Sequence, residues 1–214
     1  SNEQEHHESF GTMYFWGRKD PFNGVNHTSS EQEYITMELS VSNPRFTHSR
    51  GGWSASDSWM KPFISQAWSE DKKTIYDPCP AGYRVSSNVI WRGFTTTGNN
   101  TQIEKELNVK GTFNNGWDFY IDETKTATAW YPMHYVFWPT GKYVAQLAEH
   151  VGWAVNKMHD NSYDRHALVI DRSKTEPLGS NNSGCAFPVR CMEDIKLNNP
   201  PGGGEGYTGD EYEW

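Results

Sequence analysis

The feature that most constrains the fold of this chain is a cysteine held between two prolines, in the stretch DPCPAGYRV at residues 77–85. Pro78 and Pro80 each hold their own φ near about −65° and lack a backbone N–H, so Cys79 lies on a stiff, non-helical corner. Such a corner suits a sulfur atom that must point in one direction. Two other cysteines are present, Cys185 and Cys191.

Three cysteines are too few for a zinc site, which would need four ligands and usually a closely spaced cysteine pair. A disulfide uses two of them and leaves one over. Cys185 and Cys191 would lie roughly 20 Å apart on an extended strand, so they could pair only across a turn. A bond from Cys79 to Cys191 closes a loop of about 110 residues and is worth roughly 4–5 kcal/mol. We predict this bond, which implies an oxidising, exported compartment.

Composition narrows the classes of partner. The chain has 214 residues and a formal net charge of −8, and its Lys and Arg residues are scattered, which argues against a nucleic-acid partner. No apolar run approaches the ~20 residues of a membrane span. The first residues, SNEQEHHESF, carry neither an initiator Met nor a signal peptide, so we expect a processed or trimmed start.

Aromatic residues are unusually abundant for so polar a chain, with ten Trp, eleven Tyr and ten Phe at a mean hydropathy of −0.83. Tyr and Trp mixed with Ser, Gly and Asn are typical of recognition surfaces, because the rings give contact area at a small entropy cost. A Trp-rich core beneath polar loops would explain the same composition.

The hydrophobic pattern predicts an α+β or mostly-β domain with short strands, one or two short helices and long loops. A short helix is expected at residues 86–94, capped by Ser86 or Ser87, and a second is possible around residues 102–107. Expected strands lie at residues 12–17, 33–41, 117–121, 126–132, 151–157, 166–171 and 185–191.

Domain boundaries are expected near residues 10 and 194. Residues 1–9 form a leader or linker, and residues 10–194 form one compact domain. Residues 195–214 contain Pro200-Pro201 and three consecutive glycines before an acidic end, which is the composition of a linker or a disordered tail.

No catalytic or cofactor motif is complete. GGWSAS at 51–56 has Ser56 where a nucleophile elbow needs glycine, and GGGEGY at 202–207 ends in tyrosine where a dinucleotide loop needs glycine. Glu176-Pro177 is followed by Leu178, which lacks the amide oxygen of a calcium loop. The remaining polar set has no metal-ligand spacing and is explained as a loop running into a strand: His159, Asp160, Asp164, His166 and Asp171. We predict no enzyme activity, metal or cofactor.

Four boxes in order carry a family resemblance: GTMYFWGRKDPFNG (11–24), KTIYDPCPAGYRV (73–85), TAWYP (128–132) and GCAFPVRCMED (184–194). They resemble the Fibrobacter succinogenes major paralogous domain, which is found in exported Bacteroidetes proteins that include fimbrillin-like pilus adhesins. The resemblance implies a C-type-lectin-like fold, with the two ends of the domain brought together and ligand loops on one side. By position, it also pairs Cys79 with Cys191.

The chain departs from that family between residues 132 and 184. This window is rich in rings and holds Trp153 as its one family-like aromatic. Such a window resembles the variable region of a diversity-generating-retroelement protein, and we predict the ligand site there. The expected contacts are Tyr135, Phe137, Trp138, Tyr143, Trp153, His159, Tyr163 and Arg165. The alternative for Trp138 and Trp153 is a place in the core.

These observations predict an exported, extracellular ligand-binding domain of the adhesin type, at a pilus tip or cell surface. Its partners would be a glycan or a host or bacterial surface protein, with other pilus subunits possible. One alternative is an oxidase of the formylglycine-generating type that uses Cys185 and Cys191. Another is a structural pilus subunit, for which the acidic, Gly-broken tail is a poor donor strand.

Overall fold

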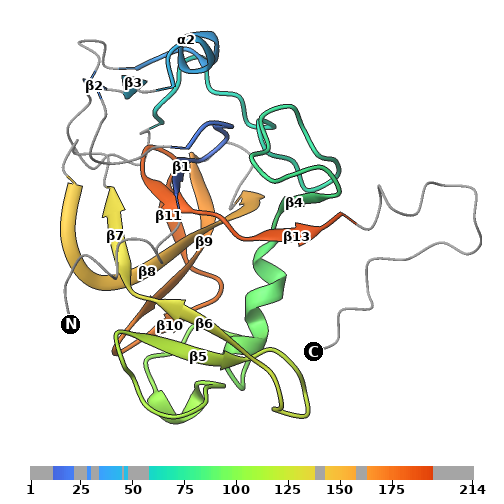
Figure 1. Ribbon diagram of the computed structural model, residues 1–214, viewed down its shortest axis with the longest axis vertical. Helices are drawn as coiled ribbons and strands as arrows, with labels where there is room; N and C mark the ends of the chain where they lie inside the picture. The colour runs from blue at the N-terminus through green and yellow to red at the C-terminus, as the bar shows by residue number, and fades with distance from the viewer. Residues whose placement is uncertain are drawn as a thin grey trace, which may run out of the picture.

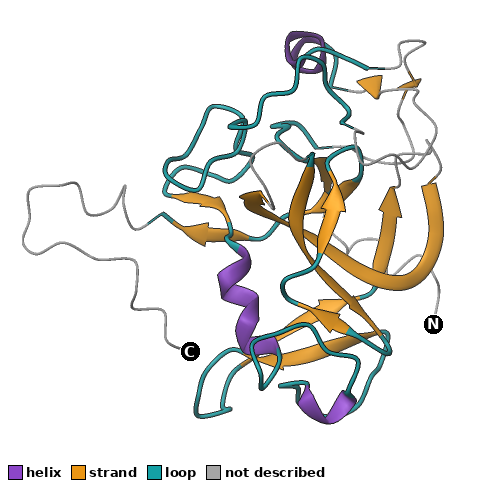
Figure 2. Ribbon diagram, turned by 180° about the vertical axis from the view of Figure 1, so that it is seen from behind, coloured by secondary structure: helices purple, strands orange, loops and turns teal. Residues whose placement is uncertain are grey.

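The computed structural model of the chain describes residues 12–21, 28–29, 34–44, 46–47, 58–137, 143–157 and 163–194. The described residues form mostly short antiparallel strands with few helices, which agrees with the expected α+β class (Figure 2). Residues 1–11 and 195–214 lie outside the described part, so the predicted leader and tail are not addressed by the structure.

One large sheet crosses the middle of the molecule in the order β1-β12-β7-β8-β9-β10, with β11 also paired to β9 (Figure 1). All of its pairings are antiparallel. Its strands are β1 (Met13–Phe15), β7 (His134–Phe137), β8 (Tyr143–Lys157), β9 (Asp164–Asp171), β10 (Thr175–Glu176), β11 (Ser180–Asn182) and β12 (Ala186–Pro188). Tyr14 pairs with Phe187, so the first and last parts of the described chain are neighbours.

Three two-stranded sheets surround the large one. They pair β5 (Gly116–Tyr120) with β6 (Thr128–Pro132), β4 (Tyr83–Val85) with β13 (Cys191–Glu193), and β2 (Thr28–Ser29) with β3 (Phe46–Thr47). The first two pairs are antiparallel and the third is parallel. The hairpin of β5 and β6 lies at one end of the molecule (Figure 1).

Residues 33–41, expected as a strand, instead contain the helix α2 (Met37–Ser42). The Thr36 hydroxyl caps this helix by accepting a hydrogen bond from the Leu39 N–H at 3.1 Å. Met37 and Ser40 are buried, three residues apart on one helical face, so the apparent alternation of apolar residues was misleading. The prediction of a strand here was wrong.

Both expected helices form as 3₁₀ turns, η1 (Asn88–Phe94) and η2 (Glu104–Glu106). The side chain of Ser87 caps η1, in agreement with the sequence prediction. Trp91 and Phe94 are buried three residues apart, which is one turn of a 3₁₀ helix. Helix η1 therefore places two rings on one side, against the hairpin.

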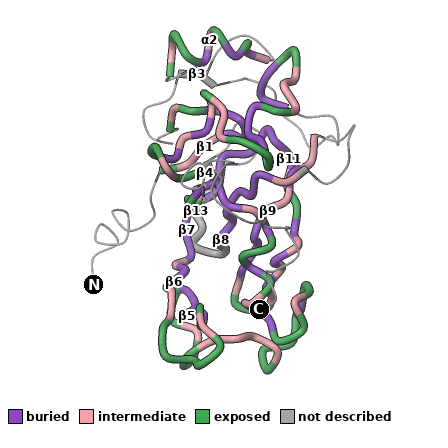
Figure 3. The backbone as a smooth tube through the Cα atoms, turned by 90° about the vertical axis from the view of Figure 1, so that its right-hand side faces the viewer, coloured by how far each residue is buried: buried purple, intermediate pink, exposed green. Residues whose placement is uncertain are grey.

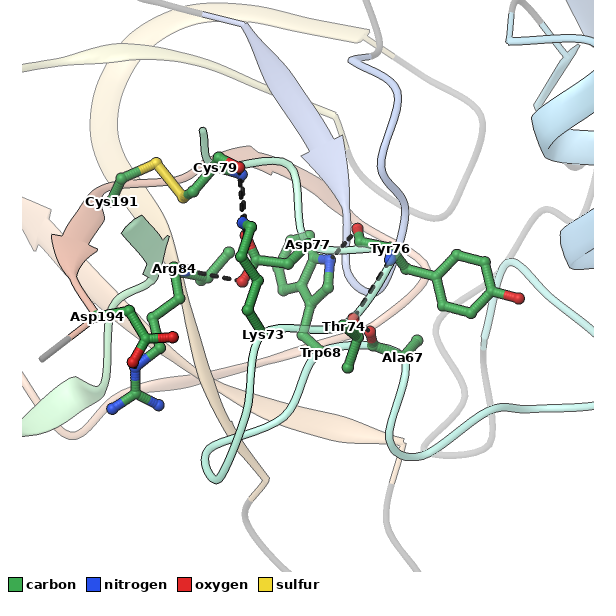
Figure 4. Close-up of polar contacts among 11 residues, drawn as sticks. Ala67, Trp68, Lys73, Thr74, Tyr76, Asp77, Cys79, Arg84, Cys191 and Asp194 are labelled. Atoms are coloured by element: carbon green, nitrogen blue, oxygen red, sulfur yellow. Dashed lines mark hydrogen bonds and ion pairs between the residues drawn. A yellow bond between two sulfur atoms is a disulfide. The ribbon is translucent and has the colours of Figure 1, made fainter. Parts of the chain in front are cut away.

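The predicted disulfide between Cys79 and Cys191 is confirmed, with the Cα atoms 5.7 Å apart (Figure 4). Asp77 holds the proline corner. One of its carboxylate oxygens accepts from the Cys79 N–H (2.9 Å) and from Lys73 (2.6 Å), while the other accepts from the Val85 N–H (3.0 Å). This buried carboxylate ties the corner to β4, so Cys79 is aimed at β13, which pairs with β4.

Two hydrophobic clusters lie on the two faces of β8 and β9. The larger cluster takes Ala167 and Val169 from β9, and the smaller takes Leu168 and Ile170. Because neighbouring residues of a strand point to opposite faces, the large sheet is covered on both sides here. The smaller cluster also contains Trp91, Phe94, Trp117, Phe119, Tyr131, Met133 and Ala154, and the hairpin of β5 and β6 closes it.

Candidate ligand-binding face

Two of the residues expected to contact a ligand, Phe137 and Trp153, lie in the core. Phe137 is 1% exposed and packs edge-on against Phe15, with ring centroids 5.6 Å apart. Trp153 is fully buried and its indole N–H donates to the Tyr14 carbonyl at 2.8 Å. The prediction that these two rings face a ligand is corrected, because both faces of their sheet are covered.

Arg165 is also a core residue rather than a surface contact. It is fully buried, and its guanidinium lies over the rings of Trp16 (4.2 Å) and Phe63 (4.9 Å). Burial lowers the pKa of Arg165 to about 10, so it keeps its charge at neutral pH. Tyr163 is half-buried and meets Phe63 edge-on at 4.8 Å. Arg165 therefore anchors the start of β9 in the larger cluster.

The other four predicted contacts comprise two tyrosines on neighbouring strands of the sheet and two residues outside the described part. Tyr135 lies in β7, and Tyr143 begins β8, where it pairs with Phe137. Trp138 and His159 lie outside the described residues.

The exposed indole of the described chain is on β6 instead. Seven tryptophans lie among the described residues, and six of them, Trp153 included, are at most 1% exposed. The seventh, Trp130, is 42% exposed. Figure 3 shows exposed residues gathered around β5 and β6 at this end of the molecule. A large ring held at the surface of a protein with so many buried ones is a candidate contact for a partner.

Trp130 is exposed because its hairpin buries only one face. Along β6, Tyr131 is buried in the smaller cluster, and its neighbour Trp130 points to the opposite, outer face. Trp130 pairs with Asp118 across the hairpin, and its ring lies over the backbone of Gly116. A Cβ atom at Gly116 would lie 2.5 Å from the Tyr131 carbonyl oxygen and 2.7 Å from the indole, so the absent side chain makes room for both the β6 backbone and the ring.

Polar groups surround this ring on the outer face, which we define as Gly116, Asp118, Tyr120, Thr128, Trp130 and Pro132. The Lys110 N–H donates to the Asp118 carbonyl at 2.8 Å, so residue 110 lies beside Asp118. Lys125 places its ammonium 5.5 Å from the centroid of the Tyr120 ring. The outer face therefore combines the exposed indole with the half-buried Tyr120 ring, a carboxylate and the ammonium group of Lys125.

Contacts from an exposed arginine and a buried histidine fix the strand that carries Trp130. The Arg190 guanidinium donates to the Trp130 carbonyl at 3.2 Å and lies 4.7 Å from the centroid of the Tyr131 ring. His150 packs against the Tyr131 ring, with centroids 5.1 Å apart, and its Nδ1 is 2.9 Å from the Pro132 carbonyl oxygen. Burial raises the pKa of Tyr131, and the nearby Arg190 charge opposes this rise. The backbone of β6 is thus held from its edge and from below.

The turn that joins β5 to β6 is also well ordered by its own groups. Asp122 accepts hydrogen bonds from the backbone N–H groups of Thr126 (2.8 Å) and Ala127 (3.1 Å). The pKa of Asp122 is lowered, chiefly by a hydrogen bond from the Thr126 hydroxyl. A tied turn reduces the entropy that the outer face would lose on binding a partner.

Sequence reasoning assigned residues 126–132 to a strand but did not single out Trp130. The signal was present in the order Ala129-Trp130-Tyr131, because two adjacent rings on a strand must face opposite sides. What the sequence could not supply was which side is covered by the rest of the chain.

Comparison with protein-family models, with curated proteins and with solved structures finds no match to this chain. Within the described part of the chain, no group of three or more His, Cys, Asp or Glu side chains is arranged to hold a metal ion. Among those same residues, no helix has the length and apolar character needed to cross a bilayer.

Proposed function

We propose that this chain is an exported, cell-surface ligand-binding domain of the adhesin type, which engages a glycan or a surface protein. The observation that carries the proposal is Trp130, exposed on a rigidly held hairpin while the six other described tryptophans are buried. An aromatic ring kept at the surface over a preorganised backbone is the arrangement that binding surfaces use.

Export is supported by the disulfide between Cys79 and Cys191, because such bonds persist in oxidising compartments. Cys191 lies on β13, near the end of the described chain, and β1 near its start pairs with β12. This arrangement is compatible with a C-type-lectin-like fold. We include that fold, and membership of the family whose boxes the sequence resembles, in the proposal. A place at a pilus tip follows from the same resemblance.

The oxidase alternative is less well supported by these contacts. It needs thiols at Cys185 and Cys191 together, and Cys191 is bonded to Cys79. Cys185 is buried and takes no part in the disulfide. Thiol counting on the intact protein would distinguish the two functions, since the binding domain has one thiol and the oxidase would have two near its C-terminal strands.

The test is binding of the full chain, with its disulfide intact, to an array of glycans and host surface proteins. Trp130→Ala should abolish binding to whichever array members the native chain recognises. Ile75→Ala is the control, because Ile75 is 74% exposed and lies away from the hairpin, two residues before Asp77. Both variants should keep their melting temperature within a few degrees, as expected for changes of about 1 kcal/mol or less.

Two results would refute the proposal. One is native-like binding by a folded Trp130→Ala variant, which would remove the outer face from the function. The other is the absence of any ligand for the native chain on either half of the array.

A further inference from the structure

The size of the exposed ring restricts what can occupy the outer face. A tryptophan offers roughly 150–250 Å² of surface, so a residue that is 42% exposed leaves roughly 60–105 Å² for a partner. A stable protein interface needs about 800 Å² from each side. The other apolar or aromatic members of this face are Tyr120 and Pro132, which are half-buried and leave the exposed area far below that size. One ring of this size matches a small flat ligand better than a protein surface.

The groups next to the ring have the chemistry of a sugar site. Asn114 and Asn115 are exposed and lead directly into Gly116, over which the indole lies. Their backbone is held by bonds from Asn114 N–H to the Gly116 carbonyl (3.2 Å) and from Met133 N–H to the Asn115 carbonyl (2.8 Å). Amide groups both donate and accept hydrogen bonds, and the Asp118 carboxylate accepts them. A pyranose needs this set, because it has one apolar C–H face and a rim of hydroxyls.

Charge favours a neutral sugar. Asp118 is the carboxylate paired with Trp130 across the hairpin, and the chain as a whole carries a formal net charge of −8. Lys125 lies over Tyr120 on the same face, but the charge paired directly with the indole is the Asp118 carboxylate, so an anionic sugar acid stacked there would meet a like charge. A neutral pyranose meets no such cost and can donate its hydroxyl protons to the Asp118 carboxylate.

We propose that the outer face binds one neutral pyranose unit of a glycan, stacked on Trp130 and hydrogen-bonded at its rim by Asn114, Asn115 and Asp118. The proposal rests on the proposed function and names its ligand class. Trp130 is the stacking residue. Gly116 is a positioning residue, since a side chain there would displace the indole or the β6 backbone that carries it.

The experiment titrates the full, disulfide-bonded chain with methyl glycosides of neutral hexoses and N-acetylhexosamines, and with methyl glucuronide as the anionic comparison. Binding is followed by saturation-transfer NMR and calorimetry. We expect at least one neutral glycoside to bind, with the strongest saturation transfer on the protons of its C–H face. Methyl glucuronide should bind at least about tenfold more weakly, a factor that corresponds to about 1.4 kcal/mol.

Three variants complete the test. Trp130→Ala should abolish saturation transfer, and Asp118→Asn should weaken the neutral glycoside while narrowing its advantage over glucuronide. Ile75→Ala should behave as the native chain. If Trp130→Ala fails to fold, Trp130→Leu takes its place, because it keeps an apolar side chain but removes the flat ring.

The outcomes separate this inference from the proposed function. Sugar binding that survives loss of the indole in a folded variant overturns the inference. If the native chain binds only proteins on the array, and Trp130→Ala abolishes that binding, the inference is overturned and the proposed function stands. Failure of the native chain to bind any glycoside or array member overturns both.

Discussion

The two faces of β8 and β9 carry hydrophobic clusters that differ in what covers them on the side away from the sheet. The larger cluster contains Cys79 of the disulfide, and the buried guanidinium of Arg165 stacks on its Trp16 ring. The smaller cluster is closed by a single two-stranded hairpin, whose far side is the outer face that carries Trp130. One side of the molecule is thus built as a closed core, while the other ends in a thin layer that presents a surface.

Trp153 and Trp130 show what the difference means for individual residues. Both lie on strands, next to small or aromatic neighbours, and both belong to stretches rich in rings. Trp153 is buried because other residues cover its face of the sheet. Trp130 is 42% exposed because the described residues cover the outer face of the hairpin only in part. Covering layers decide which ring is available for binding, and the local sequence does not.

Breaking the disulfide should have the largest effect on stability. Replacing Cys79 and Cys191 together by Ala should lower the free energy of unfolding by up to about 4–5 kcal/mol, because the bond closes a long loop. The bond joins residues 112 positions apart. Denaturant unfolding followed by circular dichroism measures the change. A loss of less than about 1 kcal/mol would contradict the idea that the larger cluster depends on this link.

Truncating the two tryptophans should sharpen the comparison between the clusters. Trp153→Ala removes a fully buried ring and the indole bond to the Tyr14 carbonyl, so it should cost about 3–5 kcal/mol. Trp130→Ala should cost about 1 kcal/mol or less, since its cross-strand contacts are half exposed. Both values come from the same unfolding experiment. Similar costs for the two variants would show that Trp130 is a structural residue rather than a surface one.

Acidification should reveal a weaker, titratable support beneath the hairpin. His150 is buried, and its ring centroid lies 4.5 Å from that of His134. Burial is the main reason that the pKa of His150 lies well below 6.5, and the charges of His134 and Arg190 lower it further. Below pH 6.5 the unfolded chain therefore binds more protons than the folded one, and stability falls as the pH drops towards the folded pKa. The loss is at most about 1.4 kcal/mol per pH unit for one proton.

The measurement is the free energy of unfolding from pH 7.5 downwards. His150→Gln should reduce the slope below pH 6.5. An unaltered slope in His150→Gln would mean that the acid sensitivity resides elsewhere.

Several features of the fold could be predicted from residues close together in the chain. The proline corner at Cys79 limits the backbone by itself, and Cys191 was the predicted partner because it lies near the end of the domain. The cap at Ser87 and the strands around residues 128–132 and 166–171 were also recognisable, because they depend on local hydrogen bonds and alternation. These are local effects, and a sequence displays them directly.

The tertiary structure decided the remainder. Helix α2 forms within a segment that alternates like a strand, and the Arg18 guanidinium stabilises the segment after it by donating to the Pro44 and Phe46 carbonyls at 2.7 and 2.8 Å. Phe137, Trp153 and Arg165 read as ligand contacts in a ring-rich window, but layers from distant parts of the chain bury them. Burial depends on what the rest of the chain places over a strand, and one strand's sequence carries no information about its cover.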